Sequence, residues 1–260
     1  MTVPDLTIGR AIAIVAAGGA AGFMNSIVGS GTLISFPTLV GVGFDKITAN
    51  VTNNIGLFPG SASASWGFRQ ELRGHARRLL VLASASAIGA LIGALLLFRL
   101  SAGTFKVVVP FLVLVGVVLV LIQPFVMTRL RERRAGTDAS QIGRITPALW
   151  LAVCAAGVYG GYFGAAQGVI LIGIMGLTLD EPLVRVNAFK NVLSTVVGLV
   201  AGLVFLTKTS VPWTSVALLS MGSISGGLIG ARIGRRIAPQ VLRGIVATVG
   251  VVAAVRLLIQ

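Results

Sequence analysis

The amino-acid sequence contains an internal repeat that relates its two halves. The run Gly89–Ala94 (GALIGA) recurs as Gly226–Ala231 (GGLIGA), which sets an offset of 137 residues (230 − 93). The repeat extends well beyond this run. The same offset pairs Asn50 with Asn187, Asn54 with Asn191 and Arg99 with Arg236. Further upstream, an offset of 135 residues (164 − 29) pairs Gly22 with Gly157, Gly29 with Gly164 and Asp45 with Asp180. The chain is therefore expected to fold as two related units rather than as one core.

Composition places both units in a lipid bilayer. Apolar residues make up 55% of the chain and charged residues 11%, with a mean hydropathy of +0.96. Soluble domains carry about 25% charged residues. The 21 basic residues greatly exceed the 7 acidic ones, but they lie in the short gaps between apolar runs. That distribution is typical of membrane loops, and it excludes the basic groove of a nucleic-acid-binding protein.

The apolar runs predict an all-α polytopic membrane protein with five helical segments in each unit. The expected segments are 9–28, 32–43, 47–67, 78–98, 106–127, 147–164, 167–178, 185–206, 212–231 and 240–258. About 20 residues are needed to cross the hydrocarbon region. The second and seventh segments are shorter and follow glycine-rich breaks at equivalent places, which is typical of the binding site of a secondary transporter. The sequence leaves open whether these two segments cross the membrane or re-enter it.

The basic loops indicate that the two units have opposite orientations. Loop 69–78 holds four arginines, whereas its equivalent, 207–211, holds only Lys208. The excess is reversed in the next pair, because 232–243 holds four arginines and 99–106 only one arginine and one lysine. Placing every strongly basic loop in the cytoplasm predicts inverted repeats at 1–127 and 147–260, joined by a flexible cytoplasmic linker at 128–146.

The first candidate binding element is the glycine-rich break in each unit. In the first unit Asn25 precedes the run Gly29, Ser30, Gly31 and Thr32, and in the second unit the equivalent positions include Gly164 and Gln167. Such a break frees backbone N–H groups at the start of a new helix, where the helix dipole favours an anion. The alternative is that these glycines only allow close helix packing.

The second candidate element is a pair of asparagines in each unit. Asn50 and Asn54 share a helix face because they are four residues apart, and Asn187 and Asn191 repeat this spacing with Lys190 beside them. Buried amides and a buried ammonium in a membrane are costly unless they bind a partner or a substrate. We expect them to complete an anion site. The alternatives are that the asparagines tie the broken helices together and that Lys190 extends towards the membrane surface.

The acidic residues exclude several other functions. None of the seven lies inside an apolar segment, so the sequence predicts no metal, no cofactor and no cation substrate. Asp45, Asp180 and Glu181 are expected to act mainly at helix starts. His75, the only histidine, lies in a basic loop far from Ser30, which argues against an intramembrane serine protease and against an enzyme in general.

The motifs resemble those of one known family. Asn25–Pro37 (NSIVGSGTLISFP), Ala49–Asn53 (ANVTN) and Arg185–Asn191 (RVNAFKN) are similar to the sulfite exporter TauE/SafE family, and the resemblance covers nearly the whole chain. It implies a multi-pass permease of the bacterial inner membrane for sulfite, sulfoacetate or other sulfonates. That family often has three consecutive glycines at the first break, where this chain has Gly29-Ser30-Gly31.

The sequence thus predicts a carrier of small sulfur-containing oxyanions that works by alternating access. An anion channel, or a carrier of non-sulfur carboxylates, is the alternative. A membrane scaffold or sensor is disfavoured by the paired breaks. The expected partners are a small anionic substrate and the lipid bilayer, with no nucleic acid. The direction of transport, the coupling ion and the formation of a homodimer stay open.

Overall fold

The structure is a bundle of helices. The computed structural model describes residues 4–99, 102–134 and 145–233, and the single positions 244, 248, 251 and 252. No strand occurs among these residues. The helices are α1 (Ile8–Ile27), α2 (Thr32–Gly41), α3 (Lys46–Gly67), α4 (Arg69–Leu72), α5 (Ala76–Arg99), α6 (Ala102–Arg134), α7 (Pro147–Tyr162), α8 (Gln167–Thr178), α9 (Leu183–Lys208) and α10 (Trp213–Ile233).

Nine of the expected apolar segments coincide with these helices, which confirms the all-α fold. The short α4 was not predicted. Helix α6 continues to Arg134, so the first residues of the expected linker 128–146 are helical rather than flexible, as a run rich in Arg, Leu and Glu favours. Residues 135–144 of the linker and most of the expected segment 240–258 lie outside the described residues.

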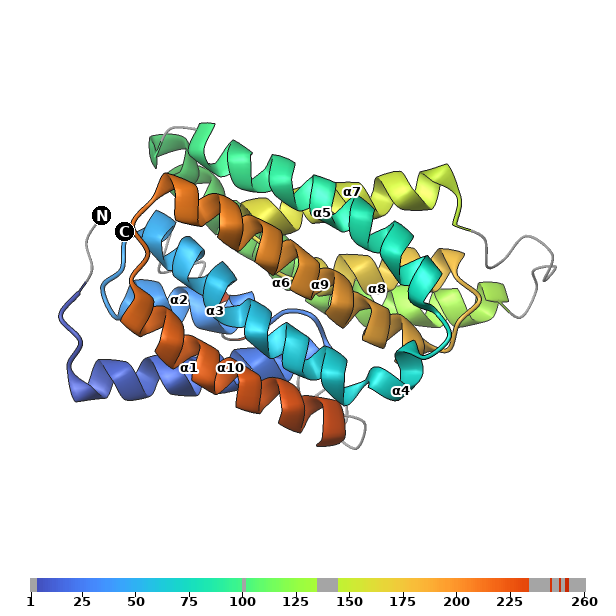
Figure 1. The fold of residues 1–260 in the computed structure, drawn as a ribbon, viewed down its shortest axis with the longest axis horizontal. Coiled ribbons are helices and arrows are strands. Elements are labelled where there is room, and N and C mark those ends of the chain that lie inside the picture. The colour runs from blue at the N-terminus through green and yellow to red at the C-terminus, as the bar shows by residue number, and fades with distance from the viewer. Residues whose placement is uncertain are drawn as a thin grey trace.

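The two short helices begin at equivalent breaks. Gly29 has φ +86° and Gly164 has φ +78°, a left-handed conformation that suits glycine because it lacks a Cβ. Each glycine ends the preceding helix, and the next helix starts three residues later, at Thr32 and at Gln167. Helices α1 and α2 then lie side by side, as do α7 and α8 (Figure 1).

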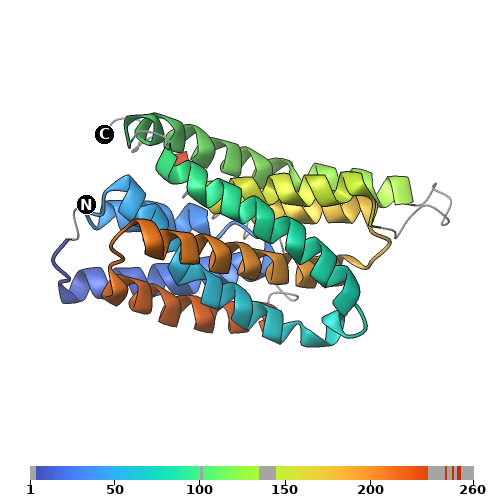
Figure 2. The same cartoon turned by 45° about the horizontal axis from the view of Figure 1, so that its top comes forward.

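Helix contacts in the two halves correspond to one another. Helix α1 packs along α10 and α5 packs along α7, while α3 lies against both α10 and α9 (Figures 1 and 2). A Cβ on Gly22 would collide with the backbone of Ser223, and a Cβ on Gly161 with that of Ala90. These close approaches of backbone to backbone are the usual way in which helices associate in lipid. They hold α1 against α10 and α7 against α5.

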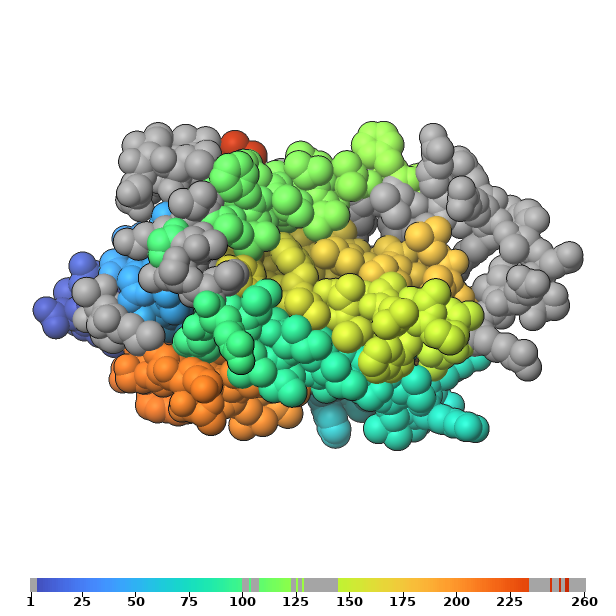
Figure 3. Space-filling view, turned by 90° about the horizontal axis from the view of Figure 1, so that it is seen from above, coloured from blue at the N-terminus to red at the C-terminus, as the bar shows by residue number. Residues whose placement is uncertain are grey.

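Apolar side chains remain exposed along the outside of the bundle. Helices α1, α5, α9 and α10 are long and apolar enough to cross a membrane. Figure 3 views the face where α5, α6 and α7 lie, and Leu95, Phe111 and Leu151 on these helices are at least 40% exposed. A soluble protein rarely leaves so continuous an apolar surface in water. The chain is therefore a membrane protein. Helix α3 is of similar length but less apolar, because it carries several buried polar residues.

Candidate functional site

The two breaks meet in the middle of the molecule. The N–H of Gly168 donates to the carbonyl oxygen of Gly29 at 3.1 Å, across the boundary between the halves. A Cβ built on Gly29 would lie 2.5 Å from the Cα of Gly168. The two backbones can approach this closely only because both positions are glycine. The starts of α2 and α8 are thereby brought to one place.

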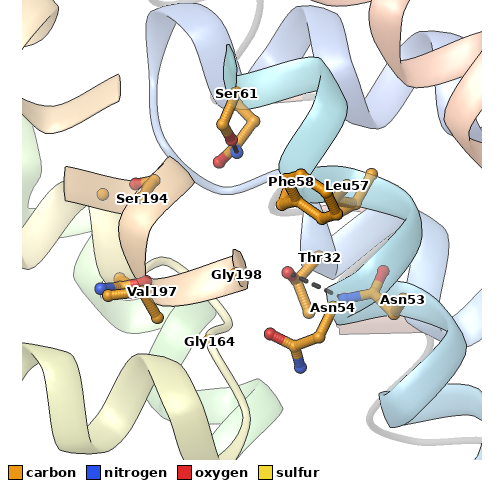
Figure 4. A pocket seen from close by; sticks show the side chains of 13 residues that line it. Thr32, Asn53, Asn54, Leu57, Phe58, Ser61, Gly164, Ser194, Val197 and Gly198 are labelled. Atoms are coloured by element: carbon orange, nitrogen blue, oxygen red, sulfur yellow. Dashed lines mark hydrogen bonds between the residues drawn. The ribbon is translucent and has the colours of Figure 1, made fainter. Parts of the chain in front are cut away.

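A polar cavity of about 40 Å³ lies beside this contact (Figure 4). Residues of both halves surround it: Asn25, Thr32, Asn53, Asn54, Leu57, Phe58 and Ser61 from the first, and Gly164, Gln167, Gly168, Ser194, Val197 and Gly198 from the second. In Figure 4, α3 carries Asn54, Phe58 and Ser61 on one side, and α9 carries Ser194 and Val197 on the opposite side. No carboxylate is among the described residues around this cavity.

Amides and hydroxyls supply the polar groups of the cavity. The side chain of Asn25 donates to Ser61 Oγ at 2.9 Å, and that of Asn53 donates to Thr32 Oγ1 at 3.2 Å. The Nε2 of Gln167 is buried and makes no hydrogen bond within the described part of the chain. A buried amide without a partner is costly, so a ligand with an acceptor oxygen is the expected complement.

The first break also retains free donors. The N–H groups of Ser30, Gly31 and Thr32 make no hydrogen bond to any described residue, and the hydroxyl of Ser30 is likewise buried without a partner. No side chain caps α2. At the second break one of the equivalent N–H groups is used, because the N–H of Gln167 donates to the carbonyl oxygen of Gly164 at 3.3 Å. The first break is thus the better donor.

Three of the predicted asparagines tie the breaks together. Asn50 donates to the carbonyl of Tyr162 at 2.9 Å, at the end of α7. Asn187 and Asn191 both donate to the carbonyl of Ser26, at 2.9 and 3.2 Å. Each asparagine thus holds the break of the other half, which fits the alternative that these residues have a structural role. None of the three lines the cavity.

Lys190 lies behind the site rather than in it. Its side chain is fully buried, and its Nζ donates to the carbonyl oxygen of Asn25 at 2.5 Å. The interpretation that it extends to the membrane surface is therefore wrong. No carboxylate lies within ion-pair distance of it among the described residues. Its Nζ therefore lies next to Asn25, which lines the cavity, without a carboxylate partner among the described residues.

Five predicted site residues line the cavity: Asn25, Thr32, Asn54, Gly164 and Gln167. The other seven lie at or behind the breaks: Gly29, Ser30, Gly31, Asn50, Asn187, Lys190 and Asn191. The sequence interpretation missed Asn53, Ser61 and Ser194. Helical spacing could have found the two serines, because Ser61 lies seven residues after Asn54 and Ser194 lies seven residues after Asn187. No group of three metal-ligating side chains occurs among the described residues.

Two broken helices that meet at a polar cavity within an apolar bundle are the arrangement of a membrane transporter. The family model described as sulfite exporter TauE/SafE matches residues 14–257, and the chain belongs to this family. It is 28% identical to the probable membrane transporter protein ORF9 of Sinorhizobium sp, over 92% of this chain and 88% of that protein. It is 27% identical to the probable membrane transporter protein YfcA of Escherichia coli K12, over 92% and 86%.

A third relative is similar over almost the same span. The probable membrane transporter protein of Haemophilus influenzae is 26% identical, over 88% of this chain and 87% of that protein. The names of these relatives give the transporter class and no substrate. The resemblance inferred from the sequence motifs is thus confirmed at the level of the family.

Proposed function

We propose that this protein is a secondary carrier of small sulfur-containing oxyanions, such as sulfite or sulfoacetate, in the bacterial inner membrane. The name of the family supports the sulfur chemistry. The cavity of about 40 Å³ favours a small ion over an extended solute. The observation that carries the proposal is Gln167, which lines the cavity and whose buried Nε2 has no hydrogen-bond acceptor among the described residues.

An oxyanion suits the charges around the cavity. Amide and hydroxyl groups line it, and no carboxylate is among its described lining residues. Lys190 does not line it, but its Nζ donates to the carbonyl oxygen of Asn25, which does. In a low-dielectric interior such a charge acts over several ångströms. We assign Gln167, Asn25 and Thr32 to direct contact with the anion, and Lys190 to offsetting its charge. The asparagines at positions 50, 187 and 191 hold the breaks around it.

Alternating access between inverted repeats is the mechanism we propose. It is supported by the helix pairs. By the sequence repeat, α1 is equivalent to α7, α3 to α9 and α5 to α10. The packed pair α1–α10 then has its equivalent in the packed pair α7–α5, and the pair α3–α10 in the pair α9–α5. Such an exchange is expected for two units related by a pseudo-twofold axis in the membrane plane. The cavity lies where the units meet, so rocking of one unit against the other can expose it to each side in turn.

The test is anion flux into proteoliposomes. Wild-type protein is expected to take up sulfite or sulfoacetate with saturation, and an imposed pH gradient or membrane potential reveals the coupling. Gln167→Met preserves side-chain length but removes the amide, and should lower the flux at least about tenfold, the effect of losing one hydrogen bond to a charged group. Gln70→Met, at an exposed position on α4, is the matched control.

Two results would overturn the proposal. Wild-type protein that is folded but transports neither anion contradicts the sulfur assignment. Full flux with Gln167→Met contradicts the assigned binding site. Flux that rises linearly with concentration indicates a channel instead of a carrier.

A further inference from the structure

A second hollow lies on the outside of the α3–α9 pair, with a volume of about 330 Å³. Ala62 and Trp66 of α3 form one wall, Val192 and Val196 of α9 form the other, and Arg69 lies at one end. We call it the α3–α9 crevice. Its walls come from both halves, and α3 and α9 lie next to each other in Figure 1. None of the residues around this hollow lines the candidate substrate cavity.

The crevice combines an apolar interior with a fixed positive charge at its end. Trp66 is 67% exposed, and the Arg69 guanidinium lies over its ring, 5.2 Å from the ring centre. Arg69 also donates to the carbonyl oxygen of Trp66 at 3.2 Å, so its position is set by α3 itself. Tryptophan and arginine together are typical of the membrane–water boundary, where an apolar body meets a polar surface.

The surroundings of Arg69 select an anionic partner. The segment 69–78 carries four arginines against one acid, Glu71, and Arg78 is already bound to Glu181. Basic residues beside the hydrocarbon region attract anionic lipid headgroups. The volume of the hollow is within the range of sites for single small molecules, and one acyl chain from the bilayer can occupy it without leaving the membrane.

We propose that the α3–α9 crevice binds one anionic phospholipid, with an acyl chain between Ala62 and Val196 and the headgroup at Arg69. The acyl chain then touches both halves, on α3 and on α9. The same two helices also enclose the substrate cavity, so the bound lipid acts on the contact between them. The proposal depends on the membrane location of the chain and not on the identity of the transported ion.

Native mass spectrometry of the detergent-purified protein tests this inference without any substrate. After removal of lipid, phosphatidylglycerol and phosphatidylcholine with identical acyl chains are added back separately. The wild type should retain one phosphatidylglycerol in preference to phosphatidylcholine. Arg69→Gln should weaken phosphatidylglycerol binding about fivefold, the loss expected for one basic residue at an anionic membrane surface. Arg73→Gln, exposed in the same segment but outside the crevice, should weaken it clearly less.

A second variant tests the apolar part of the site. Ala62→Phe fills the crevice and should weaken both lipids, whereas Leu203→Phe, 57% exposed elsewhere on α9, should weaken neither. Thermal unfolding of each variant shows whether it is folded. Equal retention of the two lipids by the wild type, or equal losses in Arg69→Gln and Arg73→Gln, would overturn the proposal. A lipid-free dimer that Ala62→Phe dissociates would overturn it as well, because a second copy would then occupy the crevice.

Discussion

Glu181 is a buried carboxylate held by basic groups from both halves. It is 5% exposed, and Arg78 of α5 donates to its Oε1 at 2.5 Å. Arg185 of α9 donates to Oε2, and His75 Nδ1 lies 3.7 Å from Oε1. Glu181 directly precedes Pro182, the N-cap residue of α9, so it lies at a helix start as expected, and its carboxylate also binds side chains of α5 and α9. Asp45 caps α3 as expected, accepting from Ile47 and Thr48.

Glu181→Gln should destabilise the protein because it removes the negative charge from between two arginines. The expected cost is about 2 kcal/mol, less than for a fully buried pair since Arg78 and Arg185 are partly exposed. In a chain of this size that lowers the unfolding midpoint by about 4–8 °C. Asp180→Asn, at the neighbouring exposed position, should change the midpoint by less than about 2 °C. Similar shifts for both variants would show that only net charge matters.

At the scale of helices, the break between α1 and α2 should be far less tolerant than a surface turn with the same backbone. Gly29→Ala places a Cβ in the left-handed region, which costs about 1–2 kcal/mol, and also against Gly168. Crowding of this kind adds about 1–3 kcal/mol. Gly74 has φ +80° and open space around it, so Gly74→Ala has only the cost of the left-handed conformation and none from crowding. Thermal unfolding in detergent compares the unfolding midpoints of the two variants. Equal shifts of the midpoint would contradict the close contact between Gly29 and Gly168.

Helix positions were predictable because each depends on local information. The segment expected at 167–178 is observed as α8 without change, and that at 47–67 differs by one residue. Apolar runs bounded by glycine or charge fix such limits. Which side of a helix lines the cavity was less predictable. Asn187 and Asn191 match Asn50 and Asn54 in sequence, but only Asn54 reaches the cavity, because the choice depends on how α3 and α9 are rotated against the opposite break.

For the whole molecule, the repeat predicted the meeting of the two breaks but not their chemistry. Equivalent positions carry Asn53 in one half and Lys190 in the other, at the repeat offset (190 − 53). Asn53 binds Thr32 within its own half, whereas Lys190 reaches across to Asn25. Symmetry of the backbone therefore coexists with asymmetry of charge. Local sequence patterns do not predict contacts such as that between Lys190 and Asn25, because the two residues are far apart in the chain.

The proposed opposite orientation of the halves makes a prediction that concerns the whole molecule. Arg73 and Ser210 are equivalent at the repeat offset, and they lie in the turns before α5 and before α10, at opposite ends of the bundle (Figure 1). With Cys154→Ser as background, since Cys154 is the only cysteine, each position is replaced by cysteine in turn. A membrane-impermeant maleimide added to intact cells should label Ser210→Cys, and should label Arg73→Cys only after the inner membrane is permeabilised.

Reaction of both cysteines from the same side would show that the bundle ends do not face opposite compartments, and would remove the inverted topology. Labelling of Arg73→Cys alone in intact cells would reverse the orientation but keep the inversion, since the two positions would still lie on opposite sides. The reversed outcome would conflict with the positive-inside rule, because loop 69–78 carries four arginines and loop 207–211 only Lys208. The experiment therefore separates the relation between the halves, which alternating access requires, from the direction in which the chain is inserted.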